Sequence, residues 1–370
     1  LVVRADDATL ARYARHGADV WARNPLALIS GEGQACVSCH KSVPYALVEP
    51  LLPGEYPAYS DLIANVNRRI RTWGENTPWY SDHKLAESEV VGGLPPNTLN
   101  QFLNGPGSRG VEAIFNAFIR AMHDAYADRR PQSETQEAFA NMWTEQIQTG
   151  PDAGRWGWIE ANLIPWEGAD SDLWGAAVAR VAVGLFPELA SDDGLELLDA
   201  ALRKAAVDTN VSLHTKAAIL WCDAESSGRL LPATTTADLV SDFLSRQRDD
   251  GGWSLRELGP WVGWEGSDSD CCPKRTIRSD AYATGFVLLA LSRNRHLVPD
   301  EAAPRLDDAA AWIAGELADP YPASPSYNRL MTNDAEVPEF RDNLYTNGGA
   351  MWAYLASWVH QKKRAPWDRG

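Results

Sequence analysis

Apolar residues recur at spacings of three and four along most of the chain, a pattern that predicts amphipathic α-helices. One set of these segments mixes charged with apolar positions, as a helix with one exposed face does. No segment alternates strictly enough to predict a β-strand. The first set therefore indicates an outer layer of helices, expected at residues 6–22, 57–74, 133–149, 193–207, 235–247 and 303–317.

A second set of helical segments lies between the members of the first and carries few charges. These segments are rich in Ala and Gly, as in the run Ala283-Thr-Gly-Phe-Val-Leu-Leu-Ala-Leu. Small residues on nearly apolar helices allow close packing on all sides. The second set therefore predicts inner helices at residues 43–52, 111–127, 171–186, 212–226, 279–293 and 343–360.

This alternation predicts an all-α fold, an (α/α)6 toroid of about twelve helices that forms a single domain of residues 1–370. Its inner helices would be parallel to one another and antiparallel to the outer helices. Links from an inner to an outer helix are short, whereas several links from an outer to an inner helix are long. Long loops in compact domains tend to carry function. We therefore expect long functional loops on one face, where the inner helices begin, at residues 23–42, 75–110, 248–278 and 318–342.

The overall charge narrows the possible partners. The 370 residues carry a formal net charge of −16, and a nucleic-acid binder needs a basic face, so no nucleic acid is expected. The longest stretch without a charge, around Ala281 to Ser292, is shorter than the roughly 18 apolar residues of a membrane-spanning helix. No signal segment begins at Leu1, as expected of a processed mature form.

The cysteines supply the most specific motif. The run Cys36-Val-Ser-Cys39-His40 is a C-x-x-C-H pattern, in which two thiols add to the vinyl groups of a porphyrin and the next His coordinates iron. A redox dithiol would be expected in a βαβ context, and a zinc site would need a second Cys/His pair at finger-like spacing. We therefore expect one covalent haem c, held by Cys36, Cys39 and the proximal ligand His40 in the 23–42 loop. Because c-type haem is attached outside the cytoplasm, we also expect a periplasmic or otherwise exported protein. The other three cysteines can form one disulfide at most: Cys222, Cys271 and Cys272.

Two segments share a pattern at the ends of outer helices, namely Gln148-x5-Gly154-Arg-Trp156 and Gln247-x3-Gly251-Gly-Trp253. The pattern resembles the QW repeat of the squalene-hopene cyclase and terpenoid-cyclase superfamily, over roughly residues 110 to 360. This resemblance implies an α-toroid fold, and with the C-x-x-C-H in front the chain looks like bacterial cyclase-like proteins that carry this motif near the N-terminus. The repeat itself is expected to be a structural staple, with Gly in a tight turn, Trp on the preceding helix end and the Gln amide on backbone groups.

The chain departs from the cyclases where their chemistry resides. It contains neither D-x-D-D, the acid motif of class II cyclases, nor D-D-x-x-D, which holds magnesium diphosphate in ionising terpene synthases. A second toroid, which usually encloses a cyclase substrate, does not fit into 370 residues. A conventional class II cyclase is therefore not expected, and whether the chain is an enzyme stays open.

The second axial ligand of a haem separates an electron carrier from a catalyst. His214 lies at the start of an inner helix, so it faces the same end of the ring as His40 and is the favoured distal ligand. A helix-start His that only caps its neighbours is an equal alternative. Two residues of the long loops, His83 and Met331, are further candidates.

Carboxylates recur where inner helices begin, a position that favours helix capping: Glu112, Asp172, Asp280 and Asp342. Gathered around one mouth they could also raise each other's pKa, and Asp172 or Asp280 would then act as a catalytic acid. Six tryptophans in the loops on this side would line an apolar pocket or serve as staples: Trp156, Trp158, Trp166, Trp253, Trp261 and Trp264.

Three hypotheses follow from these residues. The first is a periplasmic monohaem c-type cytochrome on a terpenoid-cyclase-like toroid, acting in electron transfer or in haem-based oxidation of a hydrophobic, isoprenoid-like ligand. The second is a terpenoid cyclase or isomerase that uses a mouth carboxylate as its acid. The third is a haem-bearing structural subunit of a redox complex. The expected partner is accordingly a hydrophobic small molecule or a redox partner protein.

Overall fold

The computed structural model describes residues 42–54, 56–75, 105–159, 165–226, 229–261, 279–317 and 348–368, together with scattered residues between Ala11 and Val37. Several predicted site residues lie outside the described residues: Cys36, Cys39, His40, His83, Trp264, Cys271, Cys272, Met331 and Asp342.

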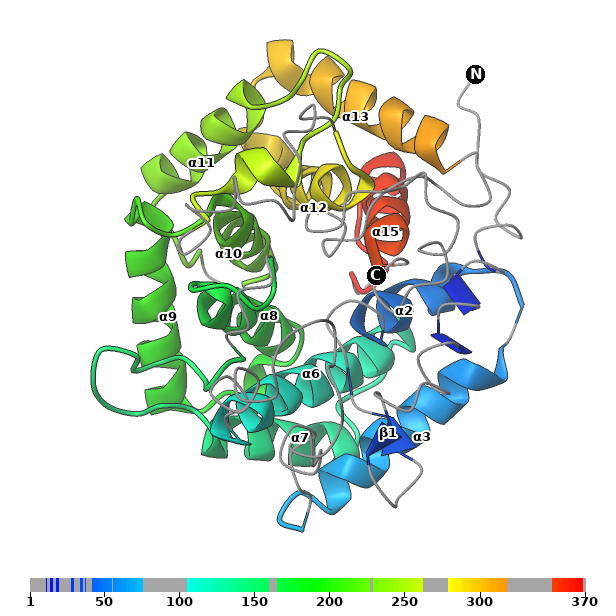
Figure 1. Cartoon of the computed structure of the whole chain (residues 1–370), viewed down its shortest axis with the longest axis vertical. Helices are drawn as coiled ribbons and strands as arrows, with labels where there is room; N and C mark the ends of the chain where they lie inside the picture. The colour runs from blue at the N-terminus through cyan, green and yellow to red at the C-terminus, as the bar shows by residue number, and fades with distance from the viewer. Residues whose placement is uncertain are drawn as a thin grey trace, which may run out of the picture.

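Six helices form a closed inner ring (Figure 1). Each of them contacts the next, and the last contacts the first. In ring order they are α2 (Ser42–Val48), α6 (Gly105–Tyr126), α8 (Ser171–Leu185), α10 (Leu213–Glu225), α12 (Ala281–Arg293) and α15 (Gly348–Lys362). The predicted all-α toroid is confirmed.

Outer helices cover this ring from outside (Figure 1). Their bounds are α3 (Pro57–Arg71), α7 (Ser133–Thr144), α9 (Asp192–Val207), α11 (Ala233–Ser245) and α13 (Ala303–Glu316). The described residues of the first predicted outer helix are also helical: Ala11, Ala14, Arg15, Ala18 and Asp19. Short 3-10 helices lie in the connections: η1 (Glu49–Leu51), η2 (Pro187–Leu189), η3 (Leu255–Leu258), η4 (Arg295–Leu297) and η5 (Asp300–Ala302).

One antiparallel hairpin was not predicted. It joins β1 (Leu28–Ile29) to β2 (Gln34–Ala35), with Leu28 opposite Ala35. Strands of two residues are too short to show an alternating pattern, which explains why the sequence gives no sign of them.

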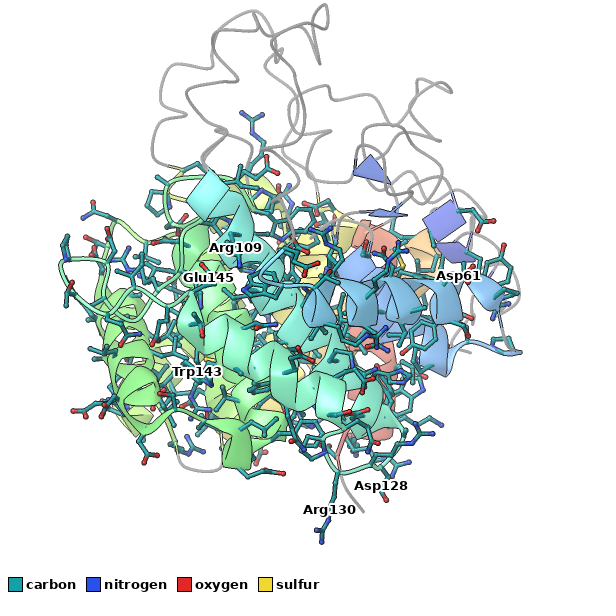
Figure 2. The ribbon with its side chains drawn as sticks, turned by 90° about the horizontal axis from the view of Figure 1, so that it is seen from below. Asp61, Arg109, Asp128, Arg130, Trp143 and Glu145 are labelled. Atoms are coloured by element: carbon teal, nitrogen blue, oxygen red, sulfur yellow. The ribbon has the colours of Figure 1, made fainter. Side chains whose placement is uncertain are left out.

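The inner and outer helices run in opposite directions, so the ring has two distinct ends. Figure 2 shows Arg109, near the start of α6, beside Glu145 at the end of α7, and their side chains are hydrogen-bonded at 2.6 Å. Asp128 and Arg130, which follow α6, lie at the opposite end. We call the end where the inner helices begin the mouth, and the end where they finish the base.

Local sequence explains where the helices begin. Ser191 caps α9 by accepting from the backbone N–H of Gly194, and Ser212 caps α10 by accepting from the backbone N–H of Thr215.

Inner helices pack closely where glycine replaces a side chain. A Cβ on Gly285 of α12 would lie 2.5 Å from the backbone nitrogen of Ala353 on α15. The prediction that small residues permit close packing of the inner ring is therefore confirmed.

The repeated Gln-Gly-Trp pattern joins neighbouring outer helices. The Gln247 amide donates to the backbone oxygens of Gly251 and of Arg305 on α13, both at 2.7 Å, and the Trp253 indole donates to Phe243 at 2.8 Å. In the first repeat the equivalent amide belongs to Gln146, which donates to Gly154 and to Gly194 on α9.

The sequence pattern expected the amide of Gln148 to meet backbone groups, which it does, but the amide that joins the two helices belongs to Gln146. Gln148 donates to the backbone and side-chain oxygens of Gln146, so it supports the staple without spanning the two helices. The first repeat has a longer turn than the second, and the wider Gln–Gly spacing moved the motif match by two residues.

Candidate functional site

Aromatic side chains fill the base half of the ring interior, which we call the lumen. Trp221 of α10 contacts Phe118 of α6 and Trp352 of α15, although neither helix is a ring neighbour of α10. Phe286 of α12 packs edge-on against both Trp221 and Trp352. Contacts between non-neighbouring helices show that these rings point inward, so they form a floor across the lumen.

The chain's C-terminal segment closes the base beneath this floor. Trp367 is buried against Trp221, and its indole donates to Glu225 at 3.0 Å. Arg293 pairs with both Glu225 and Asp368, which ties the segment to α10 and α12. In the part of the chain that the structure describes, the lumen is therefore closed on the side of the base.

His214 lies above the floor. It precedes Trp221 by seven residues, which on a helix is two turns along the same face and about 10 Å nearer the mouth. Its imidazole is fully buried, and its Nε2 shares a hydrogen bond of 2.6 Å with the Tyr282 hydroxyl. Aromatic rings surround it: Trp174, Trp261, Tyr282 and Phe286. Removal from water lowers the pKa of His214 to about 3, so the imidazole is neutral at physiological pH.

Further tryptophans extend this group toward the mouth. Trp166 packs edge-on against Tyr282 with ring centroids 4.8 Å apart, and the Trp158 indole donates to the backbone oxygen of Trp166 at 2.6 Å. We call the whole set the mouth cluster: Trp158, Trp166, Trp174, His214, Trp261 and Tyr282. Of the loop tryptophans, Trp156 and Trp253 serve as staples, as expected. That the others line an apolar pocket stays a prediction.

Glu167 is a feature that the sequence analysis missed. It follows Trp166 in the loop that leads into α8, and its side chain is half-buried. Surrounding protein atoms remove water from the carboxylate and raise the pKa of Glu167 to about 7. A carboxyl group of this kind can exchange protons near neutral pH. No sequence pattern marks Glu167, because its carboxyl group is removed from water only when the loop folds onto the ring.

The predicted acid Asp172 lies in the first turn of α8 and the predicted acid Asp280 directly precedes α12, but each has structural partners. Asp172 forms an ion pair with Arg155 at 2.8 Å, and burial raises the pKa of Asp172 while this guanidinium opposes the change. Asp280 caps α12, with its two oxygens accepting from the backbone N–H groups of Leu255 and Ala283. Their proposed acid role stays a prediction.

Glu112 also has a structural partner. It forms a buried bidentate pair with Arg69 of α3. The pair ties α6 to the outer layer, so the carboxyl of Glu112 faces away from the lumen and does not join the mouth cluster.

The haem motif lies between β2, which ends at Ala35, and α2, which begins at Ser42. The motif residues themselves lie outside the described part, so attachment of haem at the mouth stays a prediction. In His214, the predicted distal ligand, one of the two ring nitrogens already has a hydrogen-bond partner. Since Nε2 of His214 is bonded to Tyr282, only Nδ1 is open to an iron atom in this arrangement. The distal-ligand role stays a prediction.

A surface groove of about 1010 Å³ opens beside the mouth cluster. Charged side chains of both signs line it, among them Arg246, Arg256 and Asp249, and Trp261 forms one wall. Because Trp261 also contacts His214, it belongs both to the wall of the groove and to the mouth cluster.

No described helix is both long and apolar enough to cross a membrane. Within the described ranges, no group of three or more His, Cys, Asp or Glu side chains could hold a metal ion. That finding does not reach the C-x-x-C-H motif, which lies outside those ranges.

Comparison with known proteins gives little further information. No protein-family model matches the chain, and no curated protein matches it. Among solved structures, a polysaccharide lyase is similar at 12% sequence identity and a TM-score of 0.47, over 96% of this chain and 98% of the lyase. A similarity this low says nothing about activity.

Proposed function

We propose that the chain is an exported monohaem c-type cytochrome built on an α-toroid, acting in electron transfer or in oxidation of a hydrophobic ligand. The observation that carries the proposal is the position of Cys36-Val-Ser-Cys39-His40 directly before an inner helix. The helix that follows the motif in the sequence, α2, begins at the mouth, the end where the mouth cluster lies, and this supports the proposal. An aromatic, largely apolar cluster suits a hydrophobic ligand.

Cys36 and Cys39 would hold the porphyrin, and His40 would hold its iron. The bound group supplies one-electron chemistry. The other residues of the chain bind and orient the ligand: the tryptophans exclude water, and neutral His214 offers a hydrogen-bonding nitrogen.

The test is expression in a host with a cytochrome c maturation system, followed by intact mass and a dithionite-reduced absorption spectrum. The proposal expects a covalent haem adduct and a sharp α-band, both abolished in a C36A/C39A variant. Cys222→Ala is the matched control, because Cys222 is a buried cysteine distant in sequence from the motif. Full mass recovery without an adduct in the parent protein would refute the haem assignment.

A second candidate is acid-catalysed isomerisation or cyclisation, favoured by the carboxyl of Glu167 next to Trp166. Glu167 would donate its proton to an apolar ligand, and the ring faces of the mouth cluster would stabilise the cation that forms. Product analysis with isoprenoid alcohols tests this candidate. Turnover that persists in Glu167→Gln at the parental rate would exclude Glu167 as the acid.

A further inference from the structure

The surface groove beside the mouth cluster has room for a ligand. Its volume of about 1010 Å³ lies at the upper end of small-molecule sites. The end of α11, the turn at residues 247–253, η3 and the loop after η3 supply its walls. Every residue that lines the groove is exposed or half-buried, so a ligand can reach the side chains of the walls.

The charged side chains of the groove carry both signs in equal number. Three are guanidinium groups and three are carboxyl groups: Arg246, Arg248, Arg256, Asp249, Asp250 and Glu257. A lining of this kind favours neither an anion nor a cation. Guanidinium groups only donate hydrogen bonds and carboxylates only accept them, so the groove suits a ligand whose groups do both. Hydroxyl groups have this property.

Ion pairs hold part of this lining in place before any ligand binds. Arg248 pairs with Glu257 at 2.9 Å, and Arg246 pairs with Asp242 at 3.0 Å. Arg246 also donates to the backbone oxygen of Glu257 at 3.3 Å, which links the end of α11 to η3. A lining that is already ordered loses less conformational entropy on binding.

Trp261 adds an apolar wall to this polar groove. Its indole N–H donates to the backbone oxygen of Leu255 at 3.2 Å, and its ring contacts His214. The backbone oxygen of Gly259 accepts from the N–H of Leu213, which ties the loop to the start of α10. Because the indole N–H is occupied, the half-buried ring offers the groove apolar surface in a fixed orientation. A flat apolar surface suits the C–H face of a sugar ring.

A peptide fits these walls less well than a sugar. Peptides are bound by a free strand edge, by an apolar groove or by an aromatic-lined groove for proline-rich segments. The described walls are helical turns and loops without a strand edge, and the apolar side chains among them are those of Pro260 and Trp261.

We propose that this groove binds an oligosaccharide. Hydroxyl groups of the ligand accept hydrogen bonds from Arg256 and donate them to Asp249, two side chains that are exposed at the groove, and one sugar ring stacks on Trp261. The inference goes beyond the proposed function and does not need the haem, because described residues outside the C-x-x-C-H motif form the groove.

The test is calorimetric titration of the purified full chain with three neutral tetrasaccharides: cellotetraose, maltotetraose and xylotetraose. We expect at least one of them to bind with a dissociation constant in the millimolar range or below. Tetraglutamate and tetralysine, two short peptides of opposite charge, should bind about tenfold more weakly than that saccharide, because the charges of the lining balance.

Substitutions locate the bound saccharide. Trp261→Ala should weaken its binding by about tenfold, and Trp261→Phe, which keeps an aromatic ring, by about threefold. Arg256→Ala and Asp249→Ala should each weaken it by about fivefold, and as exposed side chains they can be removed without disturbing the fold. Arg130→Ala and Asp61→Ala are the matched controls: both residues are exposed, lie at the base and on α3 (Figure 2), and should leave the affinity unchanged.

Three results would overturn the inference. The first is failure of all three saccharides to bind. The second is tighter binding of either peptide than of every saccharide, which would mean that the groove selects charge or peptide rather than hydroxyl groups. The third is an unchanged affinity in both Arg256→Ala and Asp249→Ala, which would place the saccharide elsewhere on the chain.

Discussion

Three glycines provide a graded test of how the staple turns pack on the next outer helix. Gly150, Gly154 and Gly251 have φ values of 86°, 87° and 91°, so alanine at each adopts the same unfavourable backbone conformation. Their surroundings differ. A Cβ on Gly150 meets nothing within 4 Å, and one on Gly251 would lie 3.0 Å from the backbone oxygen of Asp308. A Cβ on Gly154 would lie 2.5 Å from the carbonyl carbon of Leu197 and closer still to its oxygen.

The expected losses follow from these distances. A left-handed backbone costs alanine about 1–2 kcal/mol, and the reduced entropy of the unfolded chain returns about 0.4–1 kcal/mol. Gly150→Ala should therefore cost about 1 kcal/mol. Gly154→Ala must also move the turn away from α9, and overpacking of this kind adds about 1–3 kcal/mol, for a total of about 3 kcal/mol. The loss of stability in Gly251→Ala should lie between those of Gly150→Ala and Gly154→Ala.

The assay is urea unfolding followed by far-ultraviolet circular dichroism, with midpoints compared at equal slope. The expected order of midpoints is parent, Gly150→Ala, Gly251→Ala, Gly154→Ala. Equal midpoints for the three variants would show that only the backbone conformation matters, and that the turn does not press on α9.

Three further predictions concern individual side chains. Gln146→Ala should lower the free energy of unfolding by about 2 kcal/mol, because it removes two buried hydrogen bonds. Gln148→Ala should lower it by less than about 1 kcal/mol. A lower urea midpoint for Gln148→Ala than for Gln146→Ala would show that Gln148 is the more important amide. For Glu167, whose pKa is about 7 in the fold against 4.5 normally, the folded state holds an extra proton between these values, so stability falls as pH rises from 4.5 to 7, by at most about 3 kcal/mol. Glu167→Gln should remove this loss, and urea midpoints at pH 5 and pH 8 check it. For His214, whose pKa is lowered from 6.5 to about 3, the unfolded state holds the extra proton, so this residue makes the fold less stable as pH falls from 6.5 to 3. His214→Gln should flatten that part of the pH profile, and an unchanged acid limb would mean that the imidazole is not desolvated.

Helical periodicity was sufficient to predict the toroid, because the inner helices must be apolar all round and the outer ones on a single face. Side-chain partners were harder to predict. His214 was correctly expected where an inner helix begins, but its bond to Tyr282 joins residues on two helices, and no local pattern encodes it. Glu167 was missed for the same reason. Its perturbed pKa comes from surrounding protein rather than from its sequence neighbours. Gln148 was preferred to Gln146 because motif spacing cannot show which amide faces the next helix.

The contact between α2 and α15 has a consequence for assembly. It joins segments that lie about 300 residues apart, from Val48 to Gly348. Closing so long a loop is entropically costly, and contacts of this range form late in folding. Until α15 docks, the ring is an open crescent, and its interior is accessible from the side. A bulky group attached to the chain just before α2 would then be enclosed as the ring closes, without having to pass through the finished mouth.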